Sequence, residues 1–110
     1  KPAQIVSRAE FLKMLLLAMD IQPPMPVKQD VFDDVKSDTW YAPYVAYAKD
    51  KNLIETSSNL YKPAEGMKRD EVADLIYRIV VLQLSGQPKF NAGLVVTDTQ
   101  AQKYFAGHNG

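Results

Sequence analysis

The stretch VSRAEFLKMLLLAM, residues 6–19, contains the strongest helix signal in the sequence. Ser7 followed three residues later by Glu10 is a capping-box pattern, in which each side chain accepts a hydrogen bond from the other residue's backbone N–H. The pattern predicts a helix over residues 8–20. From Phe11 to Met19 only Lys13 is polar, and a helix that is apolar nearly all round is typical of an element packed on several sides. We therefore expect the rest of the chain to surround this helix.

Length and composition indicate one small globular domain. The chain has 110 residues, and 13 basic side chains balance 13 acidic ones, so no bulk positive field is available to attract nucleic acid or an anionic membrane. The absence of cysteine excludes disulfides, thiolate metal sites and a thiol nucleophile. The apolar runs are far shorter than the roughly 20 residues that a membrane-spanning helix needs.

Two further helices are expected, both flanked by recognisable signals. Asp38 is the predicted cap of a helix that ends near Asn52, because Asn tolerates the left-handed conformation at helix ends. A third helix is predicted over residues 69–84, with Gly86 as its stop signal. Residues 87–110 form a tail with a predicted strand at residues 94–96 and a helical turn after residue 98.

The first and third helices open with similar sequences. Residues 7–12 align with residues 68–73, which keeps Arg8 with Arg69 and Glu10 with Glu71, followed by apolar positions. Such spacing indicates a supersecondary unit that is used more than once.

These features together make the sequence resemble the S-layer homology family. One complete repeat is similar to residues 32–71, and residues 7–11 resemble the closing half of a preceding repeat. The residues that carry the complete repeat are Phe32, Asp34, Val35, Trp40, Tyr61, Pro63, Arg69 and Glu71. The resemblance implies a mostly α fold, a small bundle of helix-loop-helix repeats around long central helices with short extended segments. It also implies noncovalent attachment to a cell-wall polysaccharide, often a pyruvylated one, through grooves between repeats.

Three positions depart from the family pattern. Asn52 and Glu55 stand where the family usually has Gly, and Lys68 replaces the Thr cap before the second Arg. Loss of a capping hydroxyl costs about 1 kcal/mol, and Glu55 adds a negative charge beside the expected glycan groove.

The helix starts offer a physical basis for binding an anion. Arg8 and Arg69 each occupy a first helical position, where free N–H groups and the helix dipole favour negative charge, and a guanidinium can clamp a carboxylate. Trp40 can offer a flat face to a sugar ring. The resulting candidate glycan contacts are Arg8, Arg69, Trp40, Asp34 and Tyr41.

Each candidate also has a purely structural interpretation. Arg8 and Arg69 can be solvated or paired with neighbouring carboxylates, and Trp40 fits a core position because Trp is highly buried on average. For Glu10 and Glu71 the capping role is the favoured one.

Catalytic and metal chemistry find little support. The acidic segment over residues 30–38 lacks the alternating ligands, the central Gly and the closing Glu of a calcium loop. His108 has no second histidine for a zinc site and no partners for a triad. We therefore expect no enzyme activity, no cofactor and no metal.

The overall prediction is a helical domain over residues 1–86, followed by a tail over residues 87–110 that can pack on it. Its predicted function is non-catalytic anchoring to cell-wall polysaccharide on the outside of a bacterial cell. The alternative is a structural module that binds protein in a surface layer, because two long helices are visible where the family's bundle uses three. Predicted partners are thus the polysaccharide and either further copies of the chain or other repeats of the parent protein.

Overall fold

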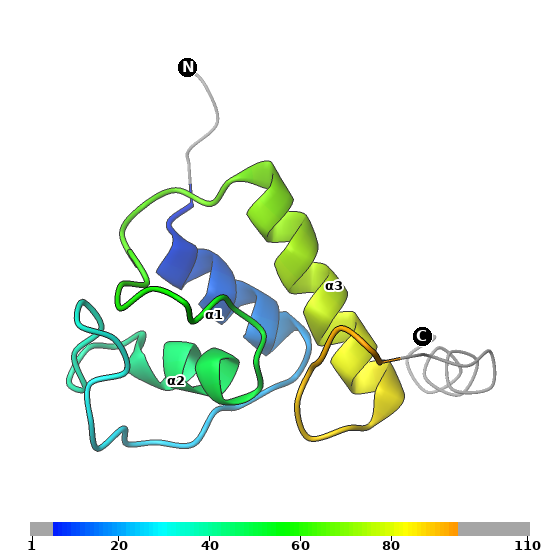
Figure 1. Cartoon of the computed structure of the whole chain (residues 1–110). Coiled ribbons are helices and arrows are strands. Elements are labelled where there is room, and N and C mark those ends of the chain that lie inside the picture. Colours follow the sequence, from blue (N-terminus) through cyan, green and yellow to red (C-terminus); the bar gives the residue numbers. More distant parts are fainter. Residues whose placement is uncertain (1–5, 95–110) are drawn as a thin grey trace.

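The computed structural model describes residues 6–94, which form three helices: α1 (Arg8–Ala18), α2 (Ala42–Asp50) and α3 (Arg69–Ser85). Within this range no strand forms, and two isolated antiparallel bridges join Ser7 to Gly66 and Phe32 to Val35. Figure 1 shows α2 below α1, and α3 to the right of both. The predicted mostly helical class is confirmed.

The start of α1 is the capping box that the sequence predicts. The Glu10 N–H donates to Ser7 Oγ at 3.1 Å, and the Ser7 N–H donates to Glu10 Oε1 at 3.2 Å. The helix ends at Ala18, slightly earlier than expected, and Asp20 has a positive φ of 61°. Local sequence therefore sets the first turn accurately.

The expectation that α1 is covered on several sides holds for the side of Phe11, Leu15 and Met19, which pack against the core, but not for the whole helix. Leu12 and Leu16 are completely buried and pack towards α2, whereas Met14 and Leu17 are 57% and 43% exposed. One apolar side of α1 thus faces solvent next to Trp40, which is 52% exposed.

The predicted start of α2 is also wrong. The helix begins at Ala42 after the cap residue Tyr41, and Asp38 does not cap it. Thr39 instead donates its N–H and its hydroxyl to the Lys36 carbonyl, and the Ala42 N–H donates to the Thr39 carbonyl. These successive tight turns carry the chain past Asp38 before the helix can begin.

The end of the α2 segment follows the prediction more closely. The helix stops at Asp50, and Asn52 adopts the left-handed conformation with φ 61°. The Asn52 side-chain amide also donates to the Phe90 carbonyl at 2.8 Å. Asn52 therefore ends this segment and fastens a distant part of the chain to it.

Helix α3 begins without a capping side chain, as the Lys68 substitution predicts. Lys68 offers no side-chain acceptor, but its backbone N–H donates to Glu71 Oε1 at 3.0 Å, which preserves half of the capping box. Gly86, at φ 69°, ends the helix in the left-handed conformation that glycine adopts easily.

The core lies between α1, α2 and the inner side of α3. Beyond α3, Phe90 is buried in the same core, and its N–H donates to the Lys51 carbonyl at 2.9 Å. Leu94, the first residue of the predicted strand, is in no strand, and the rest of that strand and the helical turn after residue 98 lie outside the described residues. The buried residues of the core are Leu12, Leu16, Val31, Phe32, Val35, Ala42, Tyr44, Val45, Ala48, Leu53, Ile54, Tyr61, Leu75, Ile79, Val81, Leu82 and Phe90.

Candidate functional site

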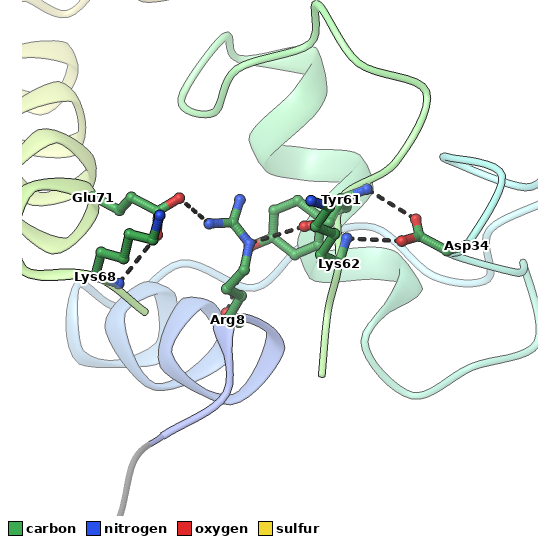
Figure 2. A network of polar contacts seen from close by, with 6 residues as sticks. All are labelled: Arg8, Asp34, Tyr61, Lys62, Lys68 and Glu71. Carbon is green, nitrogen blue, oxygen red and sulfur yellow. Dashed lines mark hydrogen bonds and ion pairs between the residues drawn. The ribbon is translucent and has the colours of Figure 1, made fainter. Parts of the chain in front are cut away.

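Arg8 lies at the junction between the two repeat helices and the loop that precedes α3. Its guanidinium forms an ion pair with Glu71 of α3, and its Nε donates to the Tyr61 carbonyl at 2.8 Å. The guanidinium carbon also lies 4.6 Å from the centre of the Tyr61 ring. Figure 2 shows Arg8 between these two partners. Its side chain is only 18% exposed, so the paired interpretation of Arg8 describes this structure.

Asp34 extends the same network on the far side of Tyr61. Its two carboxylate oxygens accept the backbone N–H groups of Tyr61 at 2.9 Å and Lys62 at 2.8 Å. Lys62 has a positive φ of 60°, so the carboxylate fixes the loop at a point where its backbone conformation is unfavourable for a side-chain-bearing residue. Figure 2 shows both bonds. The contacts of Asp34 are therefore structural.

Glu71 has two bonding partners that favour its charged form. Burial alone would raise its pKa, but the N–H of Lys68 and the guanidinium of Arg8 bond the carboxylate and hold its pKa below the ordinary value. Glu71 therefore stays ionised as the partner of Arg8 in the physiological pH range.

The cleft beside Arg8 is narrow, and the arginine side chains near it are already paired with carboxylates. Its volume is about 70 Å³, well below the roughly 300 Å³ at which ligand pockets usually begin. Glu55, which the sequence places beside the expected groove, pairs with Arg78 at 2.9 Å, and Arg78 also pairs with Asp74 at 3.0 Å. A sugar ring has little room in this cleft, and an anion would have to displace carboxylates.

A larger groove lies along the exposed side of α1. Its volume is about 330 Å³, and it is lined by Glu10, Lys13, Met14, Leu17 and Trp40. The Lys13 ammonium lies 5.3 Å from the centre of the Trp40 ring, close enough for a cation–π contact. We call this the Trp40 groove. The groove combines the flat aromatic side chain of Trp40 with the apolar side chains of Met14 and Leu17. It also contains one positively charged residue, Lys13, and one negatively charged residue, Glu10.

The remaining candidates lie at its edge or apart from it. Tyr41 is half-buried and packs edge-to-face against Trp40, with ring centres 5.2 Å apart. Arg69 is exposed at the first position of α3 and forms no ion pair with any residue between 6 and 94. The structure brings Arg8 and Asp34 together through Tyr61, and Trp40 and Tyr41 together at the groove.

The sequence allowed Trp40 to be either a glycan contact or a core residue, and the core interpretation is wrong. Because α2 begins only at Ala42, Trp40 sits in the preceding turn and not on the buried face of the helix. Sequence reasoning also missed Lys13 as a groove residue. The available signal was that Lys13 is the one polar residue in the apolar part of α1.

Stability should fall at high pH because Tyr61 is buried. Burial raises the pKa of Tyr61 to about 12 from its ordinary value of 10, so the unfolded chain loses this proton first. The protonated Tyr61 therefore contributes about 2–3 kcal/mol to the free energy of unfolding. This contribution is fully present below pH 10 and is lost as the pH rises towards 12. Urea unfolding at pH 9 to 12 measures this loss, and Tyr61→Phe should remove it. Parallel losses in both proteins would contradict the assignment.

Comparison with known proteins supports the interpretation of the repeat. Residues 31–73 match the S-layer homology domain family. The chain is 27% identical over 104 residues to the exoglucanase XynX of Acetivibrio thermocellus, which covers 89% of the chain and 9% of the enzyme. It is 31% identical over 78 residues to the amylopullulanase of Thermoanaerobacterium thermosulfurigenes, which covers 71% of the chain and 4% of the enzyme. The chain thus spans less than a tenth of each relative. No solved structure matches.

The matched segment begins at Val31 and ends in the first turn of α3, so it contains Asp34, Trp40 and Tyr61. Arg8 and the residues of α1 that line the Trp40 groove lie before it. No helix within residues 6–94 is long and apolar enough to cross a membrane. Residues 31–73 of this chain thus match the S-layer homology domain, a module that anchors proteins at the cell wall.

Proposed function

We propose that this chain holds its parent protein noncovalently on a polysaccharide of the bacterial cell envelope, with the Trp40 groove as the sugar-binding surface. The observation that carries the proposal is the exposure of Trp40, which leaves half of a large aromatic side chain in solvent beside Lys13. Leaving so much apolar area in water is costly, and a flat ring with a polar tip suits the apolar face of a pyranose.

An acidic substituent on the sugar has two candidate partners. Lys13 lies at the groove itself, and Arg69 lies exposed at the start of α3, where the helix dipole favours an anion. A carboxylate such as that of a pyruvyl ketal fits either group. Salt should weaken this part of the binding, because exposed charges are screened.

In this proposal the other candidate residues do not contact the sugar, but hold the loop at Tyr61 and the ring of Trp40 in place. Arg8 and Asp34 fix the loop at Tyr61, and Tyr41 supports the ring of Trp40 from the side. Their replacement should affect binding through folding or through the orientation of Trp40.

Truncation of Trp40 should weaken polysaccharide binding strongly. We expect Trp40→Ala to lower affinity by about 30-fold, because a central aromatic contact contributes about 2 kcal/mol, while the circular dichroism spectrum stays unchanged. Isothermal titration with purified wall polysaccharide measures the effect. Met25→Ala is the matched control, since Met25 is 58% exposed and lies outside the groove. Equal affinities for both variants would contradict the role of the groove.

Protein binding is the second candidate function, and a specific feature favours it. Ile76 and Tyr77 of α3 are 40% and 55% exposed, next to each other in the sequence. Sedimentation velocity over a hundredfold concentration range tests self-association, and a concentration-independent monomer would count against a homo-oligomer.

A further inference from the structure

A second cleft lies at the ends of α2 and α3, apart from the Trp40 groove. Its volume is about 280 Å³. It opens between Lys51, the residue that caps the end of α2, and Gly86, the residue that caps the end of α3. We call it the Lys51 cleft. It shares no residue with the Trp40 groove, so the proposed function leaves it without a role.

The side of the cleft formed by the loop after α3 is fixed at both ends. At the first end Gly86 has a left-handed φ of 69°, and its N–H donates to the Leu82 carbonyl at 3.1 Å. At the second end the Phe90 N–H donates to the Lys51 carbonyl at 2.9 Å, and the Asn52 side chain donates to the Phe90 carbonyl at 2.8 Å. The cleft is therefore already formed in the folded chain, as ligand sites usually are.

The floor of the cleft is apolar, and its rim contains two glutamines. The floor consists of the buried side chains of Leu53, Ile79 and Leu82. Gln83 and Gln87 lie at the rim, and neither side-chain amide makes a hydrogen bond to any residue between 6 and 94. Each amide therefore has a donor and an acceptor to offer to a ligand.

Lys51 adds one positive charge to the rim. Its ammonium lies 5.7 Å from the centre of the ring of Tyr47, which also lines the cleft. Within residues 6–94 it pairs only with its neighbour Asp50, at 3.7 Å, and the Asp50 side chain is 64% exposed. Such an exposed pair contributes little to stability, so the ammonium can turn to a ligand at small cost.

These groups indicate the chemistry of the ligand. An ammonium complements a carboxylate, and a glutamine amide complements a peptide group, because each has both a donor and an acceptor. The apolar floor complements a small aliphatic side chain. The end of a peptide offers all three groups, and a cleft slightly below the roughly 300 Å³ of most ligand pockets has room for one or two residues.

The helix ends make binding of a carboxylate depend on Lys51. The C-terminal ends of α2 and α3 both lie at the cleft, and the partial negative charge of a helix C-terminus disfavours an anion. A carboxylate therefore has Lys51 as its favourable charged contact at this cleft. A neutral sugar would not depend on the charge of Lys51 in this way.

We propose that the Lys51 cleft binds the C-terminal end of a short peptide with small aliphatic side chains. The carboxylate lies at Lys51, and the last peptide group lies at Gln83 and Gln87. Ends of this chemistry come from proteins, with L residues, or from cell-wall peptides, with D residues. The ligand differs from a polysaccharide, so the proposal does not rest on the proposed function.

A titration of the full chain with dipeptides tests the proposal. L-alanyl-L-alanine and D-alanyl-D-alanine are added separately to the ¹⁵N-labelled chain, and amide chemical shifts are followed by NMR. We expect at least one of them to give saturable shifts at Lys51, Gln83 and Gln87, with a dissociation constant on the order of 1 mM for so small a ligand. The tighter enantiomer identifies the source. The C-terminal amide of the same dipeptide, which lacks the carboxylate, should not saturate the site.

Three variants separate a built site from a general effect of charge. Lys51→Gln should raise the dissociation constant about tenfold or more. Lys28→Gln is the same change at an exposed lysine outside the cleft, and it should have no effect. Gln83→Met keeps a good helix former but removes the amide, and it should raise the constant about fivefold. All three should keep the wild-type circular dichroism spectrum.

Three results would overturn the proposal. The first is a folded chain that neither dipeptide saturates. The second is binding that is unchanged in Lys51→Gln or with the dipeptide amide. The third is saturation of the same amides by N-acetylglucosamine but not by a dipeptide, since the occupant would then be a sugar. Trp40→Ala should leave dipeptide binding unchanged, because Trp40 lies outside the cleft, so this proposal and the proposed function fail separately.

Discussion

Leu16→Asp is expected to unfold the domain completely. Leu16 is fully buried in the core between α1 and α2, and no basic side chain is buried in the described core to pair with a new carboxylate. Burying an unpaired charge costs several kcal/mol in addition to the lost apolar contact, which rivals the 5–15 kcal/mol that stabilises a typical domain. Far-ultraviolet circular dichroism and amide NMR dispersion at 25 °C measure the loss.

Leu17→Asp is the matched control for this change. The substitution is the same and falls on the next residue of the same helix, but Leu17 is 43% exposed at the Trp40 groove. It should leave the fold intact. If both variants unfold, or if Leu16→Asp remains folded with the wild-type midpoint, α1 does not pack as described.

Asp34→Ala is expected to lower the free energy of unfolding by about 2–4 kcal/mol. The carboxylate accepts two backbone N–H groups, from Tyr61 and Lys62, and a hydrogen bond to a charged group contributes about 1.5–3 kcal/mol. The loss also releases Lys62 from its positive φ and removes support from the loop that holds Arg8. Urea unfolding at pH 7 measures the change.

Two variants sharpen the test of Asp34. Asp34→Asn keeps one acceptor oxygen and should lose about half as much stability as Asp34→Ala. Asp33→Ala removes a neighbouring carboxylate that is exposed and makes no side-chain hydrogen bond within residues 6–94, so its effect should be under about 0.5 kcal/mol. Equal losses for Asp33→Ala and Asp34→Ala would show that the paired N–H contacts contribute little.

Features encoded by near neighbours in the sequence were predicted well. The capping box of α1, the missing cap of α3 and the left-handed residues Asn52 and Gly86 all follow from interactions within four residues. The start of α2 was missed. Asp is a favoured capping residue, but Asp38 lies within the turns formed by Lys36 and Thr39, and the helix begins only after them.

The candidate site depended on contacts that local sequence does not encode. The partner of Arg8 is Glu71, 63 residues away, and nothing in the pattern around either residue distinguishes a solvated arginine from a paired one. The exposure of Trp40 likewise depends on where α2 begins. The family resemblance identified the residues, and only the tertiary arrangement separates the buried network at Arg8 from the open groove at Trp40.

The central claim is that this chain attaches noncovalently to wall polysaccharide, and a binding isotherm tests it most directly. The purified chain is titrated into wall polysaccharide from a bacterium with an S-layer, before and after mild acid removes pyruvyl ketals, with Arg69→Ala and Lys13→Ala in parallel. We predict saturable binding that salt weakens and that falls after acid treatment. We also predict that it falls in Arg69→Ala or in Lys13→Ala, the two candidate partners of the acidic substituent. A folded chain that shows no saturable binding to either polysaccharide would contradict the account.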